Sequence, residues 1–141
     1  MKVDSYKPNY NKKVKAFNLQ EVLIVLCIIG ILLLLALPNL MPLIGKTKSY
    51  EAQIQLKYIY NAQTMNRYMY SRFSNDLNEI DFEAPKTVKE NGSSNYMYEI
   101  LEATNASFKA RATAITDFDG DGIYNIWEID ENGNPKQITK D

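Results

Sequence analysis

The chain contains no histidine and only one cysteine among its 141 residues. Histidine is the usual acid–base group near neutral pH and the commonest metal ligand, so its absence removes both of these roles. Because Cys27 has no second cysteine to pair with, no intramolecular disulfide can form. No serine, threonine or lysine stands in a recognisable pattern with a catalytic base. We therefore expect that the chain is not an enzyme.

Charge is absent from Val22–Leu37, a run of sixteen residues in which only Gly30 interrupts the apolar side chains. With the mostly apolar residues that continue to Ile44, the run approaches the ~20 residues that a helix needs to cross a bilayer. A basic segment with one acid, Asp4, precedes it and carries Lys2, Lys7, Lys12, Lys13 and Lys15. Positive charge before an apolar segment keeps the N-terminus in the cytoplasm. The sequence thus predicts a single-pass anchor whose remaining part lies outside.

A lone carboxylate, Glu21, stands at the head of this apolar run. An unpaired carboxylate in lipid costs a few kcal/mol, so Glu21 is a functional candidate that needs a partner. The alternative is an ordinary acid in the first turn of a helix, where the helix dipole favours it. A secretory signal is cleaved after its apolar region, beside small residues. Here the small residue next to a plausible cut is Ala16, which precedes the apolar run.

The order Ala16, Phe17, Glu21 and then an apolar run resembles the class III leader of type IV pilins and of the pseudopilins of type II secretion. Gly30 and Pro38 also fall where that family typically has a glycine and a proline. The resemblance implies cleavage by a prepilin peptidase between Ala16 and Phe17, and N-methylation of the new Phe17 amine. It also implies that Glu21 pairs with the methylated amine of a neighbouring subunit, and that the helix can unwind between Gly30 and Pro38 in a filament.

The resemblance divides the chain into three parts. These are a cleaved leader at 1–16, a hydrophobic transmembrane and assembly helix at 17–44, and a globular headgroup at 45–141. Without the leader the chain keeps 11 Lys and Arg against 16 Asp and Glu, a formal charge of −5. This acidic balance gives no general reason to expect a nucleic-acid partner.

The expected fold class is α+β, with a long N-terminal helix packed on a small antiparallel C-terminal sheet. Apolar residues at helical spacing predict an amphipathic helix over 49–73, and they would face the sheet: Ala52, Leu56, Ile59, Ala62, Met65, Met69 and Phe73. The opposite face of that helix would carry the polar residues Lys57, Asn61, Asn66 and Arg67. Pro85 and the Asn91-Gly92 pair are turn signals, and they predict a loop over 74–94.

The segment 95–141 is expected to form the sheet. Its predicted strands are Asn95–Leu101, Phe108–Thr116, Ile123–Asp130 and Lys136–Thr139. Residues 108–116 alternate between apolar and polar side chains, which is typical of a strand with one buried face. Asn132-Gly133 predicts a tight turn between the last two strands.

An acidic loop before the third predicted strand fits the calcium-loop formula of EF-hands. The expected ligands are Asp117, Asp119, Asp121, the carbonyl of Ile123, Asn125 and, at the twelfth place, Glu128. Hard oxygen ligands of this number suit Ca²⁺. Because both flanks are predicted strands, a strand-flanked calcium loop is favoured over a helix–loop–helix. The alternative is a metal-free Asp/Gly turn, and a straight strand would turn Glu128 away from the loop.

The leading hypothesis is a structural subunit of a type IV pilus-like filament, a homopolymer built through the N-terminal hydrophobic helix. The resemblance implies that the chain waits in the inner membrane and is assembled by inner-membrane machinery into an extracellular pilus. One alternative is a pseudopilin of a type II secretion system, which forms a periplasmic pseudopilus. A second, from another class, is a monomeric membrane-anchored calcium-binding module, which would leave Glu21 unexplained.

Overall fold

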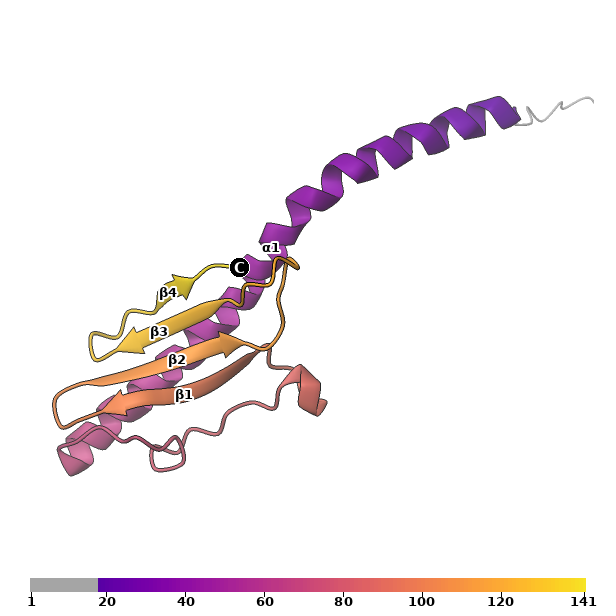
Figure 1. The fold of residues 1–141 in the computed structure, drawn as a ribbon. Coiled ribbons are helices and arrows are strands. Elements are labelled where there is room, and N and C mark those ends of the chain that lie inside the picture. The colour runs from indigo at the N-terminus through magenta and orange to yellow at the C-terminus, as the bar shows by residue number, and fades with distance from the viewer. Residues whose placement is uncertain (1–17) are drawn as a thin grey trace, which may run out of the picture. The chain divides into compact units, whose positions relative to one another are not determined.

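The computed structural model of the chain describes residues 18–141. It divides into two compact units, with the boundary after Pro38. The first unit contains the start of a helix, α1 (Leu19–Tyr70), which continues into the second unit. The second unit adds a short 3₁₀ helix, η1 (Val88–Glu90), and four strands: β1 (Tyr96–Ala103), β2 (Phe108–Ala114), β3 (Ile126–Asp130) and β4 (Lys136–Thr139). The α+β fold expected from the sequence is confirmed (Figure 1).

The four strands form an antiparallel sheet in the order β1-β2-β3-β4, so each strand pairs with its neighbour in sequence. Short connections suffice for such a meander, and the Asn132-Gly133 pair lies in the turn between β3 and β4. Gly133 has φ +76°, a conformation that glycine adopts without a steric penalty. The alternation predicted for the second strand is confirmed, because every second residue from Phe108 to Ala114 is buried.

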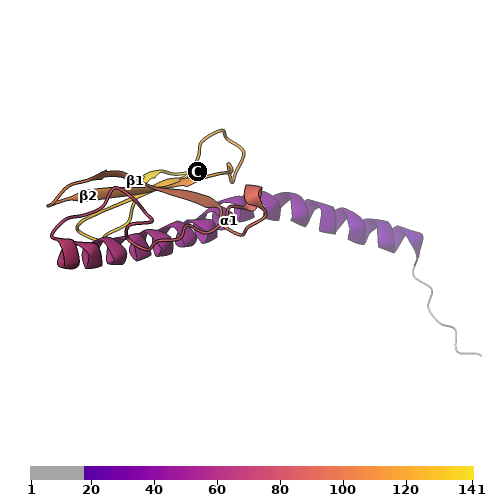
Figure 2. The ribbon, with the colours of Figure 1, turned by 90° about the horizontal axis from the view of Figure 1, so that it is seen from below.

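The second half of α1 lies along one face of the sheet, and no element of residues 18–141 covers the other face (Figure 2). Leu56 and Ile59 of the helix are fully buried in one apolar cluster with Phe108, Ala110 and Ala112 of β2. Burying a Leu or Ile side chain contributes about 1.5–3 kcal/mol, so these contacts stabilise the headgroup.

The buried face of α1 differs from the predicted one beyond Ile59. Met65 and Met69, expected to face the sheet, are exposed, and Asn66, expected on the polar face, is buried. Gln63 is also fully buried, at 0% exposure. The cause is hydrogen bonding to the chain that returns after the helix. The Gln63 amide donates to the Ser74 carbonyl at 2.6 Å and accepts from the Ser74 N–H at 2.9 Å, while Asn66 donates to the Arg72 carbonyl.

Several element ends differ from the prediction. The helix ends at Tyr70 rather than Phe73, because Ser71 adopts φ +59° and donates its N–H to the Arg67 carbonyl. A left-handed residue of this kind ends a helix. Four strand bounds shift: β1 begins at Tyr96 and runs on to Ala103, β2 ends at Ala114, and β3 begins at Ile126.

Glu51 anchors the other end of the long connection between α1 and β1. Its carboxylate accepts hydrogen bonds from the Ser94 hydroxyl at 2.6 Å and from the backbone N–H and side-chain amide of Asn95. Glu51 and Gln63 therefore fasten both ends of this connection to the same helix. Because the sheet starts directly after Asn95, these bonds position β1 on α1.

We expect Gln63→Leu to destabilise the headgroup by about 3 kcal/mol, because leucine keeps the volume but leaves the buried Ser74 N–H and C=O unsatisfied. Urea unfolding of the fragment 45–141 measures this. The matched control is Gln55→Leu, at a half-buried glutamine of the same helix whose side chain forms no hydrogen bond within residues 18–141. Equal stability of the two variants would show that the Gln63 bonds contribute nothing.

Candidate functional sites

Glu21 lies in the first turn of α1, and its side chain caps the start of the helix. Its carboxylate accepts the Asn18 N–H at 3.2 Å, while the Asn18 carbonyl accepts the N–H groups of Glu21 and Val22. Glu21 has no cationic partner within residues 18–141. Its negative charge therefore remains available to a group outside this part of the chain. Ala16 and Phe17, the residues of the expected cleavage and methylation, lie outside the described residues.

The apolar run Val22–Leu37 is exposed along its whole length when only residues 18–141 are considered. Among the described residues one helix, α1, is long and apolar enough to cross a membrane by length and composition. Gly30 and Pro38, where unwinding is expected in a filament, both lie in helical backbone. A side chain at Gly30 would meet nothing within 4 Å, so this glycine serves no packing contact inside the described chain.

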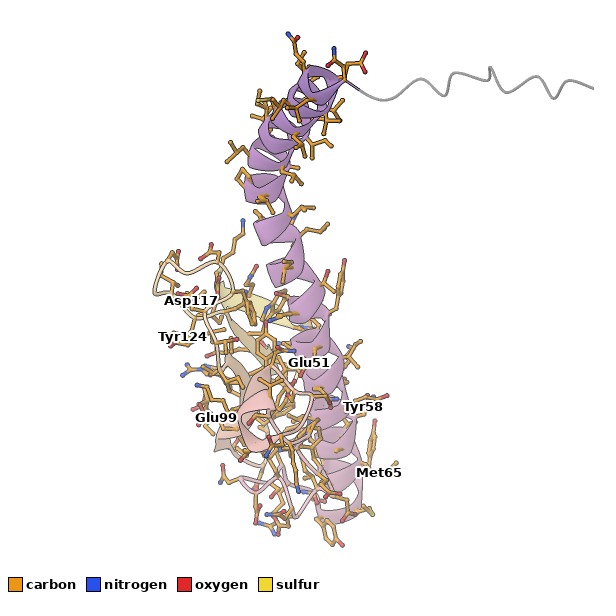
Figure 3. The ribbon with its side chains drawn as sticks, turned by 90° about the vertical axis from the view of Figure 1, so that its right-hand side faces the viewer. Glu51, Tyr58, Met65, Glu99, Asp117 and Tyr124 are labelled. Carbon is orange, nitrogen blue, oxygen red and sulfur yellow. The ribbon has the colours of Figure 1, made fainter. Side chains whose placement is uncertain are left out.

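A second exposed apolar surface continues along the headgroup half of α1. We call it the outer stripe; it consists of Tyr50, Ile54, Tyr58, Met65 and Met69, all more than half exposed. Their spacings of 4, 4, 7 and 4 place them on one side of a helix. Tyr58 and Met65 point away from the sheet (Figure 3). α1 thus has one face buried by its own sheet and another that nothing in residues 18–141 covers.

The acidic loop brings together the three aspartates predicted to bind metal and adds a fourth. One carboxylate oxygen from each lies within 4.8 Å of the others, and the four residues are Asp117, Asp119, Asp121 and Asp141. Asp117 folds the loop around itself by accepting the N–H groups of Gly120, Gly122 and Asp119. Gly120 and Gly122 have φ near +87°, which a side chain would disfavour.

Asp141 joins this cluster from the far end of the chain. Its carboxylate accepts the Phe118 N–H at 2.8 Å and the Asp119 N–H at 3.2 Å. Local motif spacing could not predict this contact, because Asp141 lies twenty residues beyond Asp121. The pKa values of two of these acids are shifted in opposite directions, from different causes. The Gly122 N–H and its neighbours lower the pKa of Asp117, whereas desolvation and the charges of Asp121, Asp141 and Asp117 raise that of Asp119.

Two further predicted ligands, Glu128 and Asn125, form side-chain hydrogen bonds with residues other than the aspartates. Glu128 lies in β3, and its carboxylate is held by Arg111 of β2 at 2.6 and 2.9 Å. Asn125 is buried, and its amide oxygen accepts the hydroxyl of Tyr96 at 3.1 Å. Burial raises the pKa of Tyr96 to about 12, so this hydroxyl stays protonated and remains a donor at neutral pH. Ile123 is exposed, and its N–H donates to Asp121.

These features define a class of protein built on one long helix. The helix is apolar enough to cross a membrane and has an acid in its first turn, and its second half packs on a small antiparallel sheet. No protein-family model matches the chain. It is similar to the type IV major pilin protein PilA of Myxococcus xanthus (strain DK1622), with 38% identity over 73 residues. That match covers 52% of this chain, and the chain spans about a third of the length of the relative. The match confirms the resemblance to type IV pilins.

Proposed function

We propose that this chain is a structural subunit of a type IV pilus-like filament, anchored in the membrane before assembly and packed with copies of itself afterwards. The observation that carries the proposal is the exposed surface of α1. Within the described residues its apolar run and its outer stripe are uncovered, and the charge of Glu21 at its head has no cationic partner. Lipid can cover the apolar run, and the helices of other copies can cover both surfaces.

The energetic argument concerns extraction from the membrane. Lipid tails are as apolar as leucine, so the helix loses favourable contacts when it leaves the lipid. That free-energy cost is offset only when other apolar helices replace those contacts. A carboxylate in that environment is costly unless a cation meets it. In the filament the amine of a neighbouring subunit would meet Glu21, as the resemblance implies. The proposed role is therefore one of assembly, in which no catalytic group is required.

Imaging tests the proposal and separates it from its alternatives. Cells lacking the gene should lose long surface filaments, and restoring the gene should restore them. Short periplasmic filaments with no surface filaments would instead support a pseudopilin of a secretion system. A chain that stays dispersed in the membrane under both conditions would support the monomeric membrane-anchored module.

We further propose that the acidic loop holds one structural Ca²⁺ through Asp117, Asp119, Asp121 and Asp141. The four carboxylates form an all-oxygen ligand set that suits Ca²⁺. A cation would also relieve the mutual repulsion that helps raise the pKa of Asp119. Because Asp141 follows β4, bound calcium would fasten the end of the chain to the loop that precedes β3.

Calcium at ten millimolar should stabilise the headgroup fragment by about 2.7 kcal/mol if the Kd is about 10⁻⁴ M, as in other extracellular calcium modules. Thermal unfolding with and without Ca²⁺ measures this. Asp119→Asn and Asp141→Asn should lose most of the gain. Glu128→Gln should keep it, because Arg111 holds Glu128 outside the cluster. A loss of the gain in Glu128→Gln, with Asp141→Asn unaffected, would instead favour the twelve-residue loop predicted from sequence. No gain in the unsubstituted fragment would mean a metal-free turn.

A further inference from the structure

A hollow of about 400 Å³ lies in the headgroup between α1 and the C-terminal end of the chain. Gly45 of the helix is close to that end, since a side chain there would meet the Asp141 carbonyl at 3.6 Å. Four charged residues line the hollow: Lys46, Lys140, Asp119 and Asp141. None of these lysines forms an ion pair with either aspartate within 4.0 Å, so both signs of charge face one space without neutralising each other.

The position of the hollow in sequence places it beside the lipid headgroups. About 20 helical residues cross the hydrocarbon core, and twenty residues counted from Val22 end at Met41. The polar layer on each side of that core is about 5–8 Å thick, which a helix crosses in four or five residues. Pro42, Gly45 and Lys46 occupy those residues, and all three line the hollow. This step rests on the membrane-anchored state in the proposed function.

We propose that the hollow binds the headgroup of a phospholipid that carries both a phosphate and a primary ammonium. Lys46 and Lys140 bind the phosphate, because charge-assisted bonds from ammonium groups are strong for phosphate oxygens. When the acidic loop holds no Ca²⁺, Asp119 and Asp141 accept the N–H groups of the lipid ammonium, so the lipid and Ca²⁺ compete for these two carboxylates. A zwitterionic headgroup satisfies both signs of charge, which a purely anionic lipid does not. The bound lipid would hold the globular part of the protein, residues 45–141, against the membrane until the subunit is extracted.

Trp127 provides a direct probe, because it is the single tryptophan of the chain and it also lines the hollow. The full chain in detergent micelles, with chelator to remove Ca²⁺, is titrated with short-chain phosphatidylethanolamine while tryptophan emission is followed. We expect a saturable change and one retained lipid by native mass spectrometry. Phosphatidylcholine, whose ammonium has no N–H, and phosphatidylglycerol, which has no ammonium, should each bind at least tenfold more weakly.

Matched variants locate the site. Lys46→Gln combined with Lys140→Gln, and separately Asp141→Asn, should weaken phosphatidylethanolamine binding about tenfold. Lys89→Gln and Asp81→Asn, at exposed positions away from the hollow, should leave it unchanged. Equal binding of the three lipids, equal binding by all variants, or no retained lipid would each overturn the proposal. If that happens while the chain still enters membranes and forms filaments, only the hollow's ligand is wrong. If the chain fails to enter membranes, the proposed function fails as well.

Discussion

Cells that express Glu21→Ala should make no filaments, or at least tenfold fewer than cells with the unsubstituted chain. In the structure this carboxylate has one hydrogen-bond donor, the Asn18 N–H, and no cation within residues 18–141. A charge at the head of an apolar run costs a few kcal/mol in lipid, and a neighbouring amine would recover that cost only in the filament. Alanine removes this gain on assembly. Electron microscopy of the cell surface counts the filaments.

Two controls separate assembly from folding and from helix capping. Glu99→Ala removes an exposed acid on the uncovered face of the sheet and should leave filament numbers unchanged (Figure 3). Glu21→Gln keeps an oxygen that can accept the Asn18 N–H but has no charge. It should fail as Glu21→Ala does. Normal filaments in Glu21→Gln would show that Glu21 acts only as a cap of α1, as the alternative from the sequence allowed.

Met65→Asp should also block filament formation, while the headgroup keeps its stability. Met65 belongs to the outer stripe and is 58% exposed, so an aspartate there costs the isolated headgroup little. In a filament with helices at its centre, the same aspartate would be buried without a partner. An uncompensated buried charge costs about 3–5 kcal/mol, and every subunit of a polymer would incur it.

Met97 of β1 offers a closely matched control, because it is 59% exposed but lies on the sheet rather than on the helix. Met97→Asp should assemble normally, and both variants should unfold at the same urea concentration as the unsubstituted headgroup. Filaments from Met65→Asp but not from Met97→Asp would mean that the sheet, rather than the outer stripe, forms the contact between subunits.

The sequence predicted the long apolar helix and the four strands because each depends on a local pattern. A sixteen-residue run without charge and the alternation in β2 are readable without knowing any long-range contact. The buried face of α1 was predicted correctly as far as Ile59. It was wrong at Met65 and Met69, where apolar spacing suggested burial but the hydrogen bonds of Gln63 and Asn66 to the returning chain decided which face turns inward.

In the acidic loop, too, the local pattern was predicted from the sequence but the long-range contacts were not. Three aspartates at alternate positions and two glycines predicted a turn that crowds carboxylates, and the structure contains that turn. The contact with Asp141 depends on where the chain lies after β4. The spacing of residues within the loop gives no information about that position. Glu128 turns to Arg111 because the two residues are direct partners in the β2–β3 register.

The most direct test of the filament account is the intact mass of this chain in filaments sheared from the cell surface. The account predicts that the chain is the repeating protein of those filaments and that its mass corresponds to a start at Phe17 with one added methyl group. Finding the chain only in the membrane fraction, with its first sixteen residues still attached, would contradict both the processing and the assembly that we propose.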